Sequence, residues 1–393
     1  MRKTHGGKPS FGLSGLHKGS RKFRGAIAKV NIHRISIVLR VFAISEGVCS
    51  IKRVRALQGR RTFQFALSGC AIAALAACGG GGGGGGGGVI STPAPAPAPS
   101  PTPSPSPSPT PTPTASFNTQ EYRTSDGPAQ HNAVAAWQVG VTGQGVAIAV
   151  IDSGIDSDSR EFAGRISPFS MDVAGNRAID DEDGHGTQVA MVAAAARDNY
   201  GVMGIAYDAT VVALRADAPG TCSNFDPTDS SSGCSFFDDD IAAGIDRAIE
   251  ADARVINISL GGGSPSLALT NAMVRAANAG IVVVVSAGND GGSIDPRLDP
   301  DNPDPFASGL LAAAPQNVII VGSVDENDQF SAFSNKAGSD ANFFITARGG
   351  DVCCVYQDGE LYIEVENGTE YIYVNNGTSF SAPQVAGAAA LLA

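Results

Sequence analysis

The first 62 residues contain almost no acidic side chains. They hold 15 of the 27 Lys and Arg residues and a single acid, Glu46, whereas the rest of the 393 residues carries 12 bases and 37 acids. The formal net charge of −11 therefore averages two opposite segments. A long apolar run is also lacking after the basic segment, because Phe63–Ala77 is shorter than the roughly 20 residues that a membrane-spanning helix needs. This order of segments argues against a nucleic-acid-binding arm and excludes a transmembrane helix at this place.

A basic region followed by a short apolar core is typical of a secretory signal. We expect residues 1–62 to be a basic extension that includes the start of the signal, and residues 63–78 to be its apolar core and cleavage site. The run ends in Leu75-Ala76-Ala77-Cys78, which resembles the lipobox of bacterial lipoproteins and implies a mature chain that begins at a lipidated Cys78. An ordinary signal with an incidental cysteine is the alternative. With the lipid, the protein is expected at the outer membrane or cell surface, or released outside the cell.

Few side chains in residues 79–115 can contribute to a hydrophobic core. Ten consecutive glycines, Gly79–Gly88, are followed by a tract rich in Pro, Ser and Thr. Glycine runs are flexible and proline tracts are extended, so this segment is predicted to be a stalk that holds residues 116–393 away from a membrane surface. A plain interdomain linker is the alternative, although no foldable segment precedes it.

Short β-branched runs alternate with helical periodicities in residues 116–393, which predicts an α/β domain. Runs this apolar are typical of strands buried on both faces, as in a mostly parallel sheet flanked by helices on both sides. The predicted strands are Gly145–Ile151, Thr210–Leu214, Val255–Ile258, Ile281–Val285 and Val318–Val321. Three aspartates, Asp238–Asp240, open one predicted helix, and Leu267–Ala279 forms another that Gly280 ends.

A different pattern follows near the end of the chain. Val355–Val374 alternates apolar and polar residues around Asp358-Gly359 and Asn367-Gly368, two strong hairpin signals. We therefore expect a small β-meander beside the serine motif described below.

Four cysteines lie outside the targeting region. Cys222 and Cys234 flank a loop rich in Ser, Asp and Gly, and in an exported protein they are predicted to close it as a disulfide. A zinc-binding pair is the competing interpretation, but no neighbouring His or second Cys-x-x-Cys supports it. For the adjacent Cys353 and Cys354, the sequence leaves open a vicinal disulfide or two thiols.

Two candidate catalytic residues stand out. Asp152 follows directly after the buried strand that ends at Ile151, and His185 lies between two glycines just ahead of the helical run Gln188–Ala196. Since only one other histidine, His131, lies in the predicted mature chain, His185 is the candidate base. Taken singly, an Asp at a strand end is ordinarily a turn or cap residue, and a lone His is ordinarily a helix cap.

A third motif, Asn376–Pro383, precedes the Ala- and Leu-rich run Gln384–Ala393 and places Ser379 at the predicted start of a helix. Proline is tolerated in a first turn, and the N–H groups and dipole of a helix start favour an anion, here the oxyanion formed when Ser379 attacks a carbonyl. A serine in this position is ordinarily only an N-cap, and Asp152 and His185 overrule that interpretation.

Together these motifs closely resemble those of the subtilisin-like serine proteases, whose triad follows the chain order Asp, His, Ser. The matching segments are Ala147–Gly154, Gly184–Thr187 and Gly377–Pro383. The resemblance covers about Trp137 to Ala393. It implies a subtilisin-like α/β fold and a serine endopeptidase with Asp152, His185 and Ser379 as its triad.

Two further segments carry the same resemblance. Ser286–Asn289 is similar to the family's oxyanion segment, which implies that Asn289 donates its side-chain amide to the oxyanion. Ser259-Leu260-Gly261 is similar to the family's substrate-binding strand. Without the resemblance, Asn289 is interpreted as a turn residue and Ser259 as part of a strand end.

The resemblance also implies the chemistry and the partners. His185 deprotonates Ser379, which attacks a peptide carbonyl and forms an acyl-enzyme, while Asp152 orients the imidazole. Proteins or peptides are the expected substrates, and no cofactor is required. The acidic run Asp180–Asp183 offers oxygen ligands for a structural calcium, but a solvated loop is the favoured interpretation and no metal site is assigned.

Two features depart from the family pattern. The stalk runs almost directly into the Asp152 motif without a folded inhibitory propeptide, and only 14 residues follow Ser379. Lipidated subtilisin-like proteases of bacterial autotransporters share such a stalk and lack that propeptide, so this subgroup is the best placement. We expect the catalytic domain to be truncated at its C-terminal end and the natural protein to continue beyond Ala393. A catalytically silent surface adhesin and an ester hydrolase are the rival functions.

Overall fold

A computed structural model describes residues 52–55, 116–224, 233–366 and 369–393. The apolar core of the predicted signal, Cys78 and the stalk lie outside these described residues.

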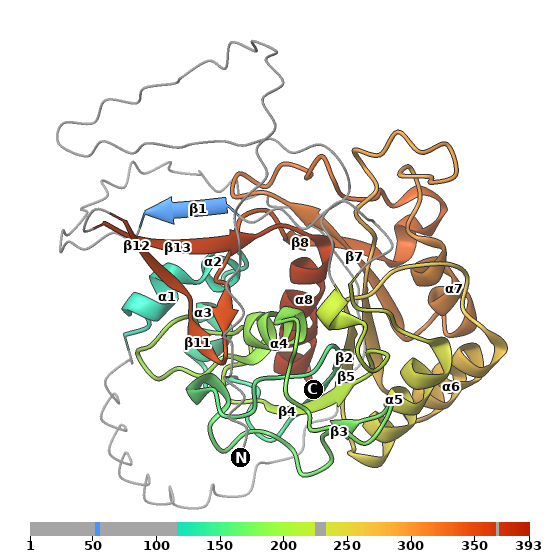
Figure 1. Ribbon diagram of the computed structural model, residues 1–393, viewed down its shortest axis with the longest axis horizontal. Coiled ribbons are helices and arrows are strands. Elements are labelled where there is room, and N and C mark those ends of the chain that lie inside the picture. Colours follow the sequence, from blue (N-terminus) through green and yellow to red (C-terminus); the bar gives the residue numbers. More distant parts are fainter. Residues whose placement is uncertain (1–51, 56–115, 225–232, 367–368) are drawn as a thin grey trace, which may run out of the picture. The chain divides into compact units, whose positions relative to one another are not determined.

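A seven-stranded sheet forms the centre of the domain (Figure 1). All its neighbouring strands are parallel. In spatial order they are β3 (Met171–Asp172), β4 (Thr210–Arg215), β2 (Ala147–Asp152), β5 (Val255–Ile258), β6 (Val282–Ser286), β7 (Val318–Val324) and β8 (Phe344–Arg348). From β2 the chain first forms the outer strand β3 and then β4, which lies between β3 and β2. It continues on the other side of β2 with β5 to β8 in order. In sheets of this kind, ligands bind at the carboxyl ends of the strands, where the order reverses.

Helices cover both faces of this sheet (Figure 1). Along β2, Ile148 and Val150 belong to one buried cluster and Ala149 and Ile151 to the other, so alternate side chains enter opposite cores. The first core contains residues of α4 (His185–Ala194) and α8 (Thr378–Leu392), and the second contains residues of α5 (Asp238–Glu250), α6 (Leu267–Asn278) and α7 (Pro305–Ala313). The predicted α/β class, with a mostly parallel sheet between two helical layers, is confirmed.

The five predicted strands agree with β2, β4, β5, β6 and β7, with differences of a few residues at their ends. In α5, Ile241, Ile245 and Ala248 are buried at helical spacing as expected. Gly280 follows α6 with φ of +75°, the left-handed conformation common after a helix end. The short strand β3 and the edge strand β8 were not predicted.

A smaller group of antiparallel strands follows β8 in the chain and contains the predicted meander. It consists of β9 (Val352–Cys353), β12 (Ile363–Glu366), β13 (Thr369–Asn375) and the hairpin of β10 (Tyr356–Gln357) and β11 (Glu360–Leu361). The hairpin turns at Asp358 and Gly359, whose φ values of +49° and +75° suit a type I′ turn. The strand β1 (Lys52–Arg55), from the segment predicted to be a basic extension, pairs with β13.

Three short helices precede β2, and residues of the first and third pack in a third buried cluster. They are α1 (Gln120–Thr124), α2 (Asp126–Gln130) and α3 (Val134–Trp137). Phe117, Trp137 and Tyr207 are buried together, and the Trp137 indole donates to the Ile205 carbonyl oxygen at 2.9 Å. Helices of four or five residues show no helical period in a sequence, so these were not predicted. The 3-10 helices are η1 (Arg160–Phe162), η2 (Cys222–Asn224) and η3 (Gly338–Phe343).

Two disulfides join cysteines of the domain. One connects Cys222 to Cys234. The other connects the adjacent Cys353 and Cys354, both buried, and so resolves the alternative that the sequence left open.

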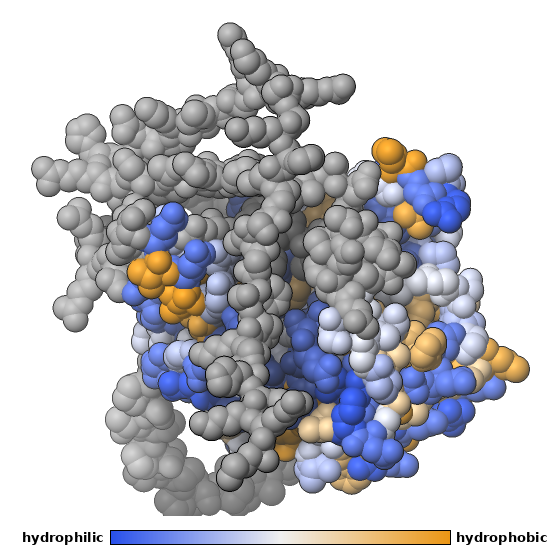
Figure 2. Space-filling model, in the orientation of Figure 1, coloured by the Kyte–Doolittle hydropathy of each residue, from blue (hydrophilic) through white to orange (hydrophobic). Residues whose placement is uncertain are grey.

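Among the helices in the described part of the chain, none is both long and apolar enough to cross a membrane. On the face shown in Figure 2, hydrophilic residues cover much of the described surface and hydrophobic residues form separate small groups. Scattered exposed apolar side chains are normal on a folded domain and mark no interface by themselves.

Candidate active site

Asp152 and His185 are in direct contact at the carboxyl edge of the sheet. Asp152 ends β2 and is 1% exposed, and its Oδ1 lies 2.7 Å from Nδ1 of His185, the first residue of α4. Oδ1 also accepts the backbone N–H of Ser153 at 2.8 Å. When Nδ1–H donates to this carboxylate, Nε2 carries the lone pair that can accept a proton. The structure thus brings two of the sequence-predicted triad residues together in the orientation that a general base requires.

The start of α4 is held tightly against the end of β2. The Gly186 N–H donates to Ser153 Oγ at 3.0 Å. A Cβ on Gly186 would lie 2.3 Å from the Gly154 carbonyl oxygen and 3.1 Å from Asp152 Cβ. A side chain at this position would therefore push His185 away from Asp152, which explains the glycine that follows the histidine.

Asp181 organises the loop that leads into α4. Its Oδ1 accepts the backbone N–H groups of Asp183 at 3.1 Å and Gly184 at 2.8 Å, and its Oδ2 accepts the N–H and hydroxyl of Thr187 at 2.8 and 2.7 Å. These donors lie at and just before the first turn of α4, where the helix itself provides no acceptors for them. Asp181 therefore positions His185 without touching it. From the sequence, Asp181 is expected only as part of a solvated acidic loop.

Ser379 is the second residue of α8, and the residue after it packs against the histidine, while no hydrogen bond joins Ser379 to His185. The ring of the next residue, Phe380, has its centroid 5.7 Å from that of His185. Ser379 Oγ donates to the carbonyl oxygen of Ser259 at 3.3 Å. The hydroxyl thus rests on the predicted substrate-binding segment, and hydrogen bonds to a catalytic base commonly tighten only when substrate binds.

Pro383 lies further into the helix than the sequence suggested. Because α8 begins at Thr378, Pro383 is inside the helix and not in its first turn. Proline has no N–H, so the carbonyl of Ser379, four residues earlier, loses its intrahelical partner. The Ser259 hydroxyl replaces that donor at 2.8 Å, and the buried Asn257 in turn donates to the Ser259 hydroxyl at 2.9 Å. The proline therefore frees a carbonyl that ties the Ser379 segment to β5.

Asn289 is exposed at the same edge of the sheet. Its Oδ1 accepts the backbone N–H of Thr378 at 2.9 Å and the Thr378 hydroxyl at 3.0 Å. These bonds fix the amide, and no described residue accepts a hydrogen bond from Nδ2. The N–H groups of Asn289 are therefore available to a ligand at the start of α8. Thr378, fully buried, was not singled out from the sequence because its role depends on this long-range contact.

The acids around His185 raise its pKa. Burial of the ring lowers the pKa, but the charge and hydrogen bond of Asp152 and the charges of Asp183 and Asp181 outweigh burial and raise it from 6.5 to about 9. The side chain of His185 is 25% exposed, so a substrate can reach the ring. The neighbouring carboxylates therefore make His185 a stronger base than a free imidazole.

The acids Asp180–Asp183 do not converge on one point. Asp180 accepts the Ser157 hydroxyl at 3.0 Å, and Glu182 pairs with the buried Arg215 at 2.9 Å. Within the described ranges, no group of three or more His, Cys, Asp or Glu side chains is arranged to hold a metal ion. The acidic run consists instead of side chains with separate structural partners.

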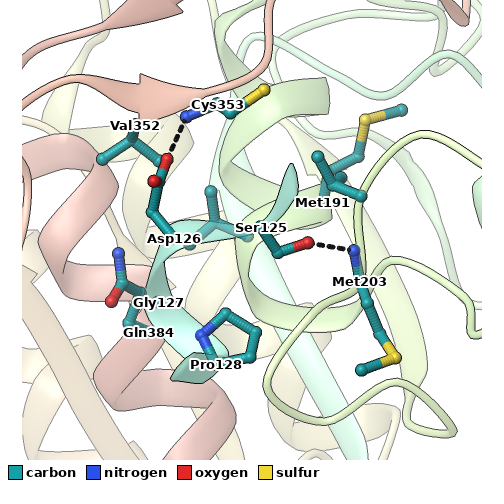
Figure 3. A pocket seen from close by; sticks show the side chains of 11 residues that line it. Ser125, Asp126, Gly127, Pro128, Met191, Met203, Val352, Cys353 and Gln384 are labelled. Carbon is teal, nitrogen blue, oxygen red and sulfur yellow. Dashed lines mark hydrogen bonds between the residues drawn. The ribbon is translucent and has the colours of Figure 1, made fainter. Parts of the chain in front are cut away.

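A small cavity lies away from these residues (Figure 3). Its volume is about 10 Å³, room for about one water molecule. Ser125 and Asp126 line it and accept the backbone N–H groups of Met203 at 2.6 Å and Cys353 at 2.8 Å. The cavity contains none of the candidate catalytic residues and lies where the start of the domain packs on β9.

Fold and site together define a class of protein. An α/β domain with a parallel central sheet carries an acid, a base and a helix-start serine in the chain order Asp, His, Ser, which is the arrangement of subtilisin-type serine peptidases. The Subtilase family model matches residues 143–393. The chain therefore belongs to the subtilase family and is a subtilisin-like serine endopeptidase.

Several curated proteins are similar to this chain. Subtilisin BL of Lederbergia lenta is 33% identical over 268 residues, which cover 67% of this chain and 80% of the relative. Thermophilic serine proteinase of Bacillus sp. (strain AK1) is 34% identical over 271 residues, 68% of this chain and 57% of the relative. Minor extracellular protease Epr of Bacillus subtilis (strain 168) is 32% identical over 223 residues, 56% of this chain and 29% of the relative.

Proposed function

We propose that this chain hydrolyses peptide bonds of proteins with Ser379 as nucleophile, His185 as general base, Asp152 as the residue that orients the base, and Asn289 as an oxyanion donor. The contact of 2.7 Å between buried Asp152 and His185, beside a helix-start serine, is the observation that carries the proposal. A buried carboxylate paired with a partly exposed histidine that has a raised pKa is a typical mark of a functional site.

The reaction follows from these positions. The Ser379 hydroxyl leaves the Ser259 carbonyl, gives its proton to His185 Nε2 and attacks the substrate carbonyl carbon, and the oxyanion that forms accepts from Asn289 Nδ2. His185 then protonates the leaving amine, and Asp152 stabilises the charged imidazole while it exists. Water attacks the acyl-enzyme in the same way and releases the acid. Side chains of this chain supply the nucleophile, the base and the oxyanion donor, so the proposed reaction requires no cofactor.

The proposal is tested with Ser379→Ala in the full chain. We expect loss of casein cleavage and of fluorophosphonate labelling, with an unchanged circular dichroism spectrum. Ser381→Ala is the matched control in the same helix, because its buried hydroxyl has no hydrogen-bond partner among the described residues. Labelling that survives in Ser379→Ala would refute the nucleophile. Labelling together with cleavage of esters but not of casein would favour an ester hydrolase.

We propose further that the mature protein is a lipoprotein at the outer membrane or cell surface, of the lipidated autotransporter subgroup. The order of basic segment, apolar core and Leu75–Cys78 supports a lipidated Cys78, and the stalk suits an anchored domain. Cys78→Ser in the full chain is expected to abolish incorporation of a labelled fatty acid and membrane partitioning. Cys70→Ser is the control, because it lies in the apolar core. Mature protein that starts elsewhere and carries no lipid would contradict the proposal.

A further inference from the structure

Asp304, the residue before α7, connects the ends of two strands at the active site. Its Oδ1 accepts the N–H of Gly262 at 2.9 Å and of Phe306 at 2.8 Å, and its own N–H donates to the Ala287 carbonyl oxygen at 2.8 Å. Gly262 follows the predicted substrate-binding segment after β5, and Ala287 follows β6. Asp304 thus joins the segment after β5, whose Ser259 carbonyl accepts from Ser379, to the segment after β6, which carries Asn289.

The second carboxylate oxygen of Asp304 lies next to the glycines that follow β5. A Cβ added to Gly261 would lie 3.4 Å from Asp304 Oδ2, and a Cβ added to Gly288 would lie 3.1 Å from Asp304 Cβ. Cβ atoms added to Gly262 and Gly263 would meet no atom within 4 Å. The glycines after β5 therefore place no side chain against this carboxylate, whereas the Asn335 side chain and Asp304 Cβ fill the space beside Gly288.

Asp304 has no positive partner among the described residues. It forms no ion pair with any Lys, Arg or His of these ranges, and the like charge of Asp290 acts on it. Burial and that charge raise the pKa of Asp304, since its two backbone hydrogen bonds offset them only in part. A partly buried carboxylate without a counterion is stabilised when a cation binds beside it.

The position of the substrate follows from the catalytic groups. In the proposed reaction, the scissile carbonyl carbon meets Ser379 Oγ, which lies 3.3 Å from the Ser259 carbonyl oxygen, and its oxygen meets Asn289. The residue that supplies this carbonyl is therefore held between the segment after β5 and the segment after β6. With its side chain directed between the same two segments, this residue would meet Asp304, which is hydrogen-bonded to both of them.

We propose that Asp304 is a specificity-determining residue that selects substrates with Arg or Lys on the acyl side of the cleaved bond. The inference rests on the proposed function, because it places the substrate by Ser379 and Asn289. A guanidinium or ammonium group at the end of a long apolar stem can pass the side-chain-free backbone of Gly261–Gly263 and pair with the carboxylate of Asp304.

The test compares fluorogenic peptides that differ only in Arg, Lys or Leu before the cleaved bond, with the full chain and with Asp304→Asn. Asparagine keeps the oxygen that accepts from Phe306 and Gly262, and it is a good N-cap, so the variant is expected to fold. The wild type should prefer Arg and Lys, and Asp304→Asn should lower the Arg-to-Leu ratio of kcat/KM by about 10²-fold, the loss expected when a desolvated charge pair loses one partner.

Asp301→Asn is the matched control, because this nearby acid is exposed and pairs with Lys336 at the surface. It should keep the wild-type ratio. Equal cleavage of the Arg and Leu peptides by the wild type, or an unchanged ratio in Asp304→Asn, would overturn the inference while fluorophosphonate labelling at Ser379 still supported the peptidase. Absence of labelling in the wild type would overturn the proposed function and, with it, this inference.

Discussion

At the scale of single residues, the protonation state of His185 decides the pH at which the enzyme works. A base accepts a proton only when it is neutral, and the pKa of His185 is raised to about 9. We therefore expect kcat/KM for a peptide without titratable groups to rise with pH and to reach half its maximum near pH 9. Measurement of kcat/KM between pH 6 and 11 tests this, and a midpoint near the ordinary value of 6.5 would contradict it.

The pH profile also separates the role of Asp152 from simple packing. Its charge and hydrogen bond are the largest influences that raise the pKa of His185. Asp152→Asn is therefore expected to move the midpoint of the residual activity toward lower pH, besides lowering its height. Lower activity with an unmoved midpoint would mean that the carboxylate affects the geometry alone.

A second prediction at this scale concerns Asn289. Its Oδ1 is held by Thr378, and its N–H groups are available to a developing oxyanion. Asn289→Ala is expected to lower kcat by about 10²–10³-fold with little change in KM, the range known from removal of the oxyanion-hole asparagine of a subtilisin. Steady-state kinetics measure both constants. A rise in KM at unchanged kcat would assign Asn289 to substrate binding instead.

At the scale of elements, Asp181 supports the start of α4. Asp181→Ala removes the acceptor of four hydrogen bonds, so we expect a loss of about 0.5–2 kcal/mol, as for other helix caps. Since the charge of Asp181 also raises the pKa of His185, the midpoint of the pH profile should move to lower pH. Thermal unfolding and the pH profile measure the two effects.

Asp180→Ala is the matched control for Asp181. The side chain of Asp180 accepts only the exposed Ser157 hydroxyl, so the variant should keep both the unfolding temperature and the pH midpoint of the wild type. Equal effects of the two substitutions would show that Asp181 has no special role at the start of α4.

The elements also show how far the sequence predicts this structure. A local sequence pattern marks the strands that are buried on both faces and the helices α5 and α6. The three motifs around Asp152, His185 and Ser379 are local patterns as well. The start of α8 was predicted at Ser379 and lies at Thr378, but Pro383 was wrongly expected in the first turn. Only the fold shows that Pro383 frees the Ser379 carbonyl for Ser259.

The supporting residues of the site were missed for the same physical reason. Asp181, Thr378 and Asp304 act through contacts between segments that are distant in sequence, and each is an ordinary turn, loop or cap residue when read alone. Thr378 and Asn289 are separated by 89 positions, and Asp304 and Gly262 by 42. Resemblance in the sequence suggested Ser259, Leu260 and Gly261, but not the acid that lies beside them.

At the scale of the whole molecule, the active site and the fold have opposite pH requirements. The active site needs a pH high enough to deprotonate His185, whereas the fold contains buried acids that are more stable when protonated. Glu161 is fully buried, its Oε1 accepts the Tyr356 hydroxyl at 2.8 Å, and its Oε2 has no partner among the described residues. Burial raises the pKa of Glu161 from 4.5 to about 8, although the bond from Tyr356 opposes the shift.

This raised pKa makes stability fall as the pH rises. The folded chain keeps the Glu161 proton up to about pH 8, and the unfolded chain releases it near pH 4.5, so the folded state binds more protons between these values and loses stability across them. Glu161→Gln removes the titration. We expect it to unfold at a higher temperature than the parent at pH 9 and at nearly the same temperature at pH 4, where Glu161 is protonated in both states.

The comparison is made by thermal unfolding in the Ser379→Ala background, so that self-digestion does not contribute. Asp156→Asn is the graded control, because burial raises the pKa of Asp156 only to about 6 and its titration ends at lower pH. Its stabilising effect should therefore be smaller than that of Glu161→Gln and complete by about pH 7. A Glu161→Gln variant that unfolds at the parent temperature at pH 9 would show that the ionised carboxylate is accommodated without cost. The conflict between catalysis and stability would then have to arise from other groups.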